Sequence, residues 1–248
     1  MRAAVASRMP EQNQLLRALP RAEYNRLLPG LTDVTLRHGE VLFDRGQRIG
    51  YVYFPQRSVI SLLAPVRDGP GVEVAIIGNE GIVGLSVFLG TATSQSRAVS
   101  QVPDGARRLS VRAFARALSR GSVLRQIMLR YAGTLLGQIA QCAACNQRHS
   151  VSQRCARWFL MAQDRVGADH FDLTQEFLGQ MLDVGRPTVS SAARQLNAAG
   201  AITYSRGHVT ITSRTQLERE ACPCYAAIVR DYAHAFSAAP PRARVSSR

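Results

Sequence analysis

The pattern of apolar residues changes at Ser110, and this change most constrains the fold of the chain. Between Leu31 and Leu109, short runs rich in Val, Ile, Tyr and Phe recur about every ten residues, separated by Gly, Asp and Pro. Such spacing is typical of an antiparallel sandwich or jelly roll. From Ser110 onward the apolar spacing becomes helical. The sequence therefore predicts an α+β protein with an N-terminal β-domain and a largely helical remainder.

The predicted chain has four parts. A β-domain occupies residues 13–121, and a short helical segment interrupted by Pro20 leads into it. A long helix covers 122–149, and a second domain covers 150–225. Residues 226–248 form a C-terminal extension, whose end is rich in Ala, Pro, Ser and Arg and is expected to be disordered.

The helix predicted over 122–149 begins at a plausible N-cap, Ser122, and carries a seam with alternating steps of four and three residues, as on a coiled-coil face. The seam consists of Leu124, Met128, Tyr131, Leu135, Gln138, Cys142, Cys145 and His149. A helix this long between two domains favours a dimer interface, so we expect a homodimer. The alternative is that the helix packs on the chain's own β-domain. The two are compatible, because a helix has more than one face.

Charge restricts the partners of the chain. Its 248 residues include 31 Lys+Arg, all of them arginine, against 17 Asp+Glu, for a net charge of +14. Because 46% of the residues are hydrophobic, the chain can bury ordinary cores, and its charge does not signal disorder. Guanidinium groups favour bidentate phosphate contacts, so the composition indicates an anionic partner such as nucleic acid or an acidic membrane.

The N-terminus lacks the apolar run of a signal peptide, and no later apolar stretch approaches about 18 residues. We therefore expect a cytoplasmic protein with no membrane partner. The cysteines lie at 142, 145, 155, 222 and 224, and their odd number does not suit a disulfide framework. No catalytic motif such as a nucleophile elbow or a phosphate-binding glycine loop is present, so we do not expect an enzyme.

Residues 172–212 carry the clearest functional signal. Thr174 can cap a first helix, in which Gly179 permits the close approach of a crossing helix. Asp183 lies in the following turn, where a left-handed backbone is often required and Asp is tolerated. Pro187 then suits the first turn of a second helix, where its missing N–H costs nothing. Two short helices joined in this way predict a helix-turn-helix.

The second helix has two different faces. Val189, Ala193 and Leu196 point inward, whereas its outer face is small, polar and cationic. After Gly200, two alternating strands around Ser205-Arg206-Gly207 predict a hairpin wing. A helix of this kind fits the major groove of double-stranded DNA, where arginines contact guanine edges or phosphates. The predicted DNA contacts are Arg186, Thr188, Ser190, Ser191, Arg194, Arg206 and His208.

From about residue 13 to residue 225, these segments resemble the Crp/Fnr family of bacterial transcription regulators. The segments GEVLFDRG (39–46), YVYFPQRSVISLL (51–63) and NEGIVGLSVFLG (79–90) are similar to the family's cyclic-nucleotide-binding-like double-stranded β-helix. The helix over 122–149 resembles its dimerisation helix, and 173–212 resembles its winged helix-turn-helix. The resemblance implies a homodimer that binds a two-fold symmetric operator, with RNA polymerase as a further partner.

The resemblance also locates an effector pocket, formed by Glu80, Gly81, Ile82, Gly84, Leu85, Ser96 and Arg97. In members that bind cyclic AMP, a glutamate in a G-E-x-G-L turn grips the ribose hydroxyls and a later Arg-Ser grips the cyclic phosphate. Ile82 stands at the position of that glutamate, and the later element reads Gln95-Ser96-Arg97-Ala98. Isoleucine accepts no hydrogen bond. We therefore expect cyclic-AMP binding to be lost and the β-domain to be a scaffold or a sensor of an unidentified small molecule.

The cysteines leave one alternative function open. Cys142, Cys145 and His149 lie on one helix seam, and a dimer could bring six such ligands together as a redox or metal sensor. One helix seldom supplies a complete tetrahedral set, and cysteine is often simply buried. The segment Cys222-Pro223-Cys224 has one intervening residue rather than two and no matching pair nearby, and no cysteine precedes Cys142 to bind an N-terminal iron–sulfur cluster. We therefore predict no metal site and no cofactor.

Overall fold

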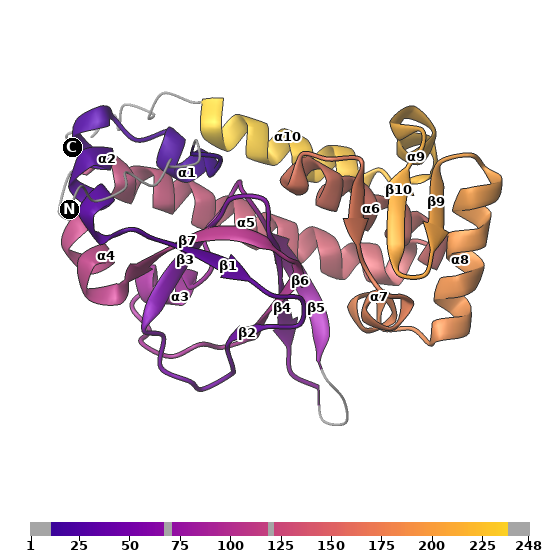
Figure 1. Cartoon of the computed structure of the whole chain (residues 1–248), viewed down its shortest axis with the longest axis horizontal. Helices are drawn as coiled ribbons and strands as arrows, with labels where there is room; N and C mark the ends of the chain where they lie inside the picture. The colour runs from indigo at the N-terminus through magenta and orange to yellow at the C-terminus, as the bar shows by residue number, and fades with distance from the viewer. Residues whose placement is uncertain (1–10, 67–70, 119–121, 238–248) are drawn as a thin grey trace, which may run out of the picture.

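The structure, a computed structural model, describes residues 11–66, 71–118 and 122–237 (Figure 1). The β-domain occupies one end of the molecule and the helix-turn-helix the other, and one long helix runs between them. Within the described residues, no helix is both long and apolar enough to cross a bilayer.

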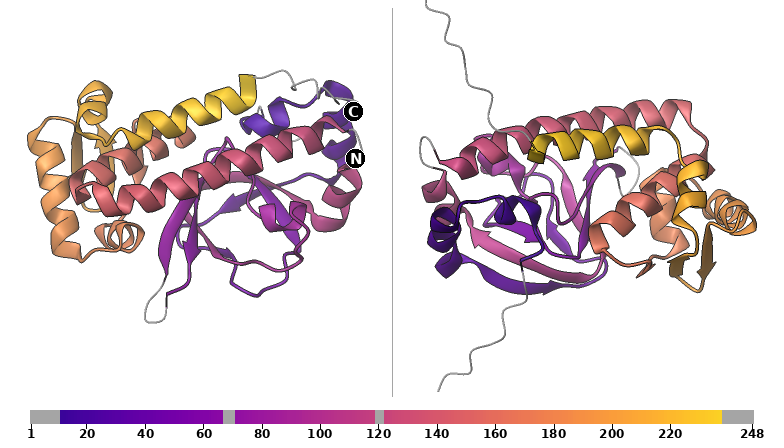
Figure 2. Two further views of the ribbon diagram at one scale, coloured as in Figure 1. Left: turned by 180° about the vertical axis from the view of Figure 1, so that it is seen from behind. Right: turned by 90° about the horizontal axis from the view of Figure 1, so that it is seen from above.

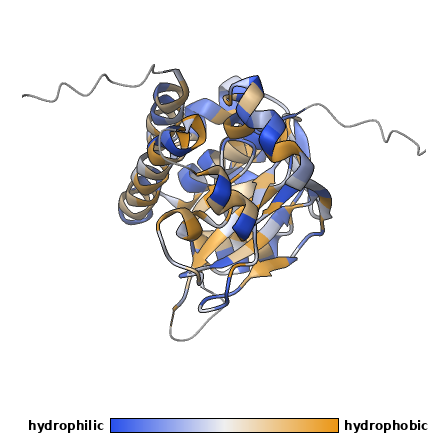
Figure 3. Cartoon of the chain, turned by 90° about the vertical axis from the view of Figure 1, so that its left-hand side faces the viewer, coloured by the Kyte–Doolittle hydropathy of each residue, from blue (hydrophilic) through white to orange (hydrophobic). Residues whose placement is uncertain are grey.

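The β-domain consists of two antiparallel sheets that enclose an apolar core, which confirms the predicted double-stranded β-helix. One sheet has the order β1-β7-β3, from β1 (Thr32–Leu36), β7 (Asp104–Ser110) and β3 (Tyr51–Pro55). The other has the order β2-β6-β4-β5, from β2 (Val41–Phe43), β6 (Arg97–Val102), β4 (Val59–Ala64) and β5 (Val72–Ile77). Figure 3 shows many hydrophobic residues along these strands, and most residues of β4 and β6 are buried.

Short helices flank the sheets. The lead-in forms α1 (Gln14–Arg17) and α2 (Arg21–Leu27), followed by the 3-10 turn η1 (Leu28–Gly30). Ser110 caps α4 (Val111–Ala117), as predicted. The apolar run over 81–90, expected as part of the strand pattern, instead forms α3 (Leu85–Phe88). The left-handed backbone of Gly84, with φ of 99°, breaks the extended path, and only an isolated bridge joins Val83 to Tyr53.

The long helix α5 (Val123–Arg148) begins at the predicted cap, since Ser122 accepts a hydrogen bond from the Arg125 amide at 3.2 Å. Its predicted seam packs on the chain itself: Gln138 Nε2 donates to the Ile76 carbonyl at 3.0 Å, and Tyr131 is 1% exposed. The seam residues therefore pack within the chain, which leaves only another face of α5 for a dimer contact. The opposite face of α5 stays open.

The C-terminal domain consists of α6 (Val151–Val166), α7 (Gln175–Leu182), α8 (Arg186–Ala198), α9 (Arg214–Glu220) and a small sheet. The sheet has the order β8-β10-β9, from β8 (His170–Asp172), β10 (His208–Ile211) and β9 (Ile202–Ser205). The two wing strands were predicted. Strand β8 was not, because its polar residues suggested a loop and only pairing with β10 holds it extended.

A further helix, α10 (Cys224–Ser237), follows α9 and lies along α5 (Figure 2). It buries Tyr225, Ile228 and Tyr232. The predicted division at residue 225 falls near the start of this helix. The helix α10 is stabilised because it buries an apolar stripe against α5 and α6. The predicted disorder at the end of the chain concerns 238–248, which lie outside the described residues.

Candidate functional site

The turn between α7 and α8 has the geometry that the sequence predicted. The Thr174 hydroxyl accepts a hydrogen bond from the Phe177 amide at 3.2 Å and caps α7. A Cβ on Gly179 would lie 2.9 Å from the Val184 carbonyl, so only glycine allows the chain to pass this close. Asp183 has a left-handed φ of 52°. These local features fix the orientation of α8 relative to α7.

Helix α8 divides into a buried and an exposed face. Val189, Ala193 and Leu196 are buried as predicted, together with Ala192. Arg186, Thr188 and Arg194 are exposed, whereas Ser190 and Ser191 are half-buried. In the part of the chain that the structure describes, Arg186 and Arg194 form no ion pair. Their guanidinium groups are therefore available to an external anion.

One predicted contact residue has an additional role. The Ser190 hydroxyl donates a hydrogen bond to Gln175 Oε1 at 2.7 Å, which ties α8 to the first turn of α7. Ser190 therefore helps to fix the orientation of α8, in addition to lying beside its exposed face.

The wing brings two more predicted residues next to this face. Arg206 and Gly207 both have positive φ, 50° and 84°, which gives the two-residue turn that matches the twist of a hairpin. Arg206 is exposed at the tip. His208 Nδ1 lies 2.5 Å from Asp172 Oδ1 on β8, and both side chains are exposed. The sequence did not indicate this pair because β8 was not predicted.

The structure separates the predicted effector residues. Glu80 Oε1 lies 2.8 Å from Arg165 Nη2 of α6, and the two side chains are only 8% and 6% exposed. A Cβ on Gly81 would lie 2.3 Å from the Tyr131 hydroxyl oxygen, and Ile82 is fully buried. Gly81 and Ile82 therefore pack in the interior. Glu80 and Arg165 line a cavity of about 300 Å³ between the β-domain, α6 and α10, away from the other predicted effector residues.

The other predicted effector residues lie elsewhere. Gly84, Leu85 and Ser96 line a cavity of about 150 Å³ whose remaining wall includes Leu62 and Leu135. Pockets that hold small-molecule ligands usually measure roughly 300 to 1,000 Å³. Arg97 Nε lies 3.8 Å from Asp44 Oδ2 near the surface. The arginine is thus held by a carboxylate and does not line this cavity.

A second interdomain contact involves Glu73 of β5, which the sequence did not single out. Its carboxylate accepts hydrogen bonds from Trp158 Nε1 of α6 at 3.0 Å and from the Ser61 hydroxyl of β4. Burial raises the pKa of Glu73 to about 7, although these hydrogen bonds and Arg157 oppose the shift. The ionisation of one carboxyl is therefore linked to the contact between the β-domain and α6.

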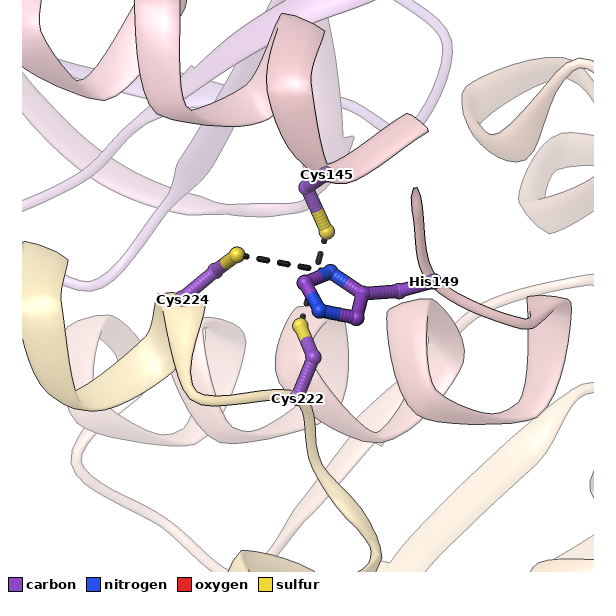
Figure 4. Close-up of side chains that lie close together, drawn as sticks. All are labelled: Cys145, His149, Cys222 and Cys224. Carbon is purple, nitrogen blue, oxygen red and sulfur yellow. Dashed lines mark hydrogen bonds between the residues drawn. The ribbon is translucent and has the colours of Figure 1, made fainter. Parts of the chain in front are cut away.

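Four potential metal ligands lie close together between the end of α5 and the start of α10 (Figure 4). Cys145 and His149, at the end of α5, face Cys222 and Cys224, at the start of α10, and their ligand atoms all lie within 4.8 Å of one another. The prediction that the 222–224 pair has no partner nearby is therefore wrong. Cys142 is not part of the group, because its sulfur accepts a hydrogen bond from Arg157 Nη1 at 3.3 Å.

Comparisons with known proteins agree with this architecture. Residues 153–220 match the Crp-like helix-turn-helix domain family. A search of curated proteins finds no significant match.

Solved structures similar to most of the chain include FixK2 from Bradyrhizobium japonicum, with 16% identity and a TM-score of 0.65 over 77% of this chain and 98% of that one. CLP from Xanthomonas campestris, described as a c-di-GMP responsive global regulator, has 14% identity and a TM-score of 0.59 over 78% and 100%. A CooA mutant from Carboxydothermus hydrogenoformans has 15% identity and a TM-score of 0.58 over 86% and 97%. At these identities the likeness establishes the fold.

Proposed function

Because the chain has the fold of the Crp/Fnr regulators and carries a Crp-like helix-turn-helix domain, we propose that it is a transcription regulator that binds DNA sequence-specifically as a homodimer. The exposed face of α8 carries the proposal: Arg186 and Arg194 stand unpaired on it, and Arg206 of the wing lies on the same domain. One such helix from each protomer would enter successive major grooves of a two-fold symmetric operator.

Selection of bound sequences from random DNA duplexes, at two salt concentrations, tests this proposal directly. We expect a two-fold symmetric motif. Arg186→Ala should lose about 1–3 kcal/mol of discrimination at one or two base pairs in each half-site. Arg219→Ala removes an exposed arginine of α9 and serves as the control, since it should leave the motif unchanged. Selection that enriches no motif would rule out the DNA-reading role.

The open face of α5 supports the dimer. Leu129 and Leu136 are 55% and 62% exposed there, and Gly133 and Gly137 lie beside them. Each glycine in a helix costs about 1 kcal/mol relative to alanine, and a Cβ at either position would meet no atom within 4 Å. A second α5 helix packed closely against this face would account for both the exposed leucines and the glycines.

Light scattering or sedimentation measures the dimer. Leu136→Glu should convert the dimer to a monomer and abolish binding to a symmetric operator. Val66→Glu, at an exposed apolar residue just after β4, is the matched control and should stay dimeric. A wild-type chain that sediments as a monomer at micromolar concentration would contradict the proposal.

We also propose that the β-domain has lost the binding of cyclic AMP. Buried Ile82 replaces the ribose-binding glutamate, and Arg165 neutralises Glu80. The nearby cavity of about 150 Å³ is small and partly apolar. Calorimetric titration with cyclic AMP should give no binding heat, and operator affinity should not change. Binding at micromolar concentration would refute this part of the proposal.

A further inference from the structure

The group of Cys145, His149, Cys222 and Cys224 is built from segments far apart in the chain. Cys145 Sγ lies 3.4 Å from Cys222 Sγ, although 77 positions separate the two residues. Cys224 Sγ lies 3.5 Å from His149 Nδ1. In Figure 4 the four side chains point toward one another from α5 and from the start of α10. The fold therefore brings together three thiols and one imidazole.

This donor set suits one particular ion. Three cysteines and one histidine form a closed tetrahedral site for Zn²⁺, with Zn–S near 2.3 Å and Zn–N near 2.0 Å. Those bond lengths place two sulfur ligands of a tetrahedron about 3.8 Å apart, and a sulfur and a nitrogen ligand about 3.5 Å apart. The Cys224–His149 pair at 3.5 Å has this spacing, and the Cys145–Cys222 pair at 3.4 Å needs to open by about 0.4 Å. All four ligand atoms lie within 4.8 Å of one another, so shifts of about 1 Å or less complete the tetrahedron. A four-iron cluster, by contrast, holds its ligands apart by its own width.

Ordinary core packing does not account for the group. Cys145, Cys222 and Cys224 are at most 3% exposed, yet they contact one another as a cluster separate from the main hydrophobic core. Gln141 Nε2 donates a hydrogen bond to Cys224 Sγ at 3.0 Å, as outer residues do for metal-bound thiolates. The three thiols therefore form a group of their own, with a polar side chain hydrogen-bonded to one of them.

The charges around the group give a second, independent reason. Arg154 and Arg157 of α6 are 7% and 5% exposed, and neither forms an ion pair with a carboxylate among the described residues. The Nε atom of each is buried without a hydrogen-bond partner. Arg154 Nη2 donates to the Leu182 carbonyl, and Arg157 Nη1 donates to Cys142 Sγ at 3.3 Å, one turn before Cys145. Asp183 acts electrostatically on Arg154 and Glu73 on Arg157, and Cys145 and Cys222 act on both. Buried cations are costly unless enough negative charge lies near them. Three thiolates around a divalent ion carry one net negative charge and would add it beside both guanidinium groups.

We propose that Cys145, His149, Cys222 and Cys224 bind one Zn²⁺ ion, and that this ion fixes the DNA-reading domain to α5. The ligands join the end of the long helix to the connection between α9 and α10, on either side of the α5–α6 junction. Their thiols release protons on binding, and no electron transfer is involved. The metal site stands independently, whereas its effect on DNA binding rests on the function proposed above.

Metal analysis of the full chain, purified under reducing conditions without an affinity metal, tests the site. We expect one zinc per chain. Cys145→Ser and Cys222→Ser should lower the zinc content to near zero. Cys142→Ser, one turn earlier on α5 and outside the group, is the matched control and should retain the metal. Gln141→Ala should weaken zinc affinity about tenfold.

Cobalt titration of the chelator-treated wild-type chain gives a measurement that does not depend on a variant folding. Co²⁺ should bind at one equivalent, with the visible absorption of tetrahedral thiolate coordination, and Zn²⁺ should displace it. A chain that contains no zinc and binds no cobalt would overturn the proposal. So would a Cys145–Cys222 disulfide or a bound iron–sulfur cluster in the purified protein.

Operator affinity of the zinc-loaded and chelator-treated chains tests the coupling. We expect removal of zinc to weaken binding by about 5- to 150-fold, the usual range of such couplings, and added Zn²⁺ to restore it. Equal affinities would overturn the coupling but leave the metal site intact. Zinc bound by a chain that selects no operator would instead reject the proposed function, so the two failures are distinguishable.

Discussion

Replacing Glu73 by glutamine should remove a pH dependence from the stability of the protein. In the folded chain, burial against Trp158 and Ser61 raises the pKa of Glu73 from 4.5 to about 7. Between those pH values, the folded chain keeps a proton that the unfolded chain has lost, so the free energy of unfolding falls as pH rises. The shift corresponds to about 3 kcal/mol lost between pH 4.5 and pH 8. Glu73→Gln keeps an oxygen that can accept from Trp158 and cannot ionise.

Urea unfolding followed by the fluorescence of Trp158, the only tryptophan, measures this loss. We expect the wild-type and Glu73→Gln proteins to have similar free energies of unfolding at pH 4.5, and the Glu73→Gln protein to be the more stable of the two at pH 8. Glu176→Gln, at an exposed carboxylate on α7, is the control and should follow the wild-type curve. Parallel pH profiles for Glu73→Gln and the wild type would refute the reasoning.

Three further substitutions test the interdomain contacts and the turn. Glu80→Ala leaves the buried charge of Arg165 unpaired and should lower the free energy of unfolding by about 3–5 kcal/mol. Replacing both Glu80 and Arg165 by apolar residues should lower it less, and chemical denaturation of the single and double variants measures the difference. Gly81→Ala drives a methyl group into the Tyr131 hydroxyl and should destabilise by about 1–3 kcal/mol, and an unchanged melting temperature would contradict the close contact. Asp183→Val places a branched side chain at a left-handed residue and should cost about 1–2 kcal/mol in thermal unfolding, while Asp183→Asn, which tolerates that backbone, should not.

The distribution of charge illustrates how far composition can be interpreted. Eight arginines and no acidic residue occupy residues 105–149. Of these, Arg107 is buried in ion pairs with Glu11 and Asp33, and α4, which carries Arg112 and Arg116, lies at the opposite end of the molecule from α8 (Figure 1). The most basic segment therefore does not coincide with the DNA contacts proposed on α8, and the anionic partner that net charge indicates stays a prediction.

The sequence by itself determined the features whose causes are local. The caps at Ser110, Ser122 and Thr174, the left-handed turn at Asp183 and the buried face of α8 each depend on residues within a few positions of one another. Their spacing was therefore enough to predict the β-domain, the long helix and the helix-turn-helix.

Only the tertiary structure decided which surfaces meet. The seam of α5 has the same spacing whether it faces a second chain or its own β-domain, and the fold of the β-domain selected the second. The sequence predicted Glu80 as an effector contact, whereas in the fold Arg165 of α6 forms an ion pair with it. Cys145 and Cys222 are 77 positions apart, and no local pattern relates them. Contacts between distant segments depend on the packing of whole helices, which is why the candidate metal site could not be predicted from spacing.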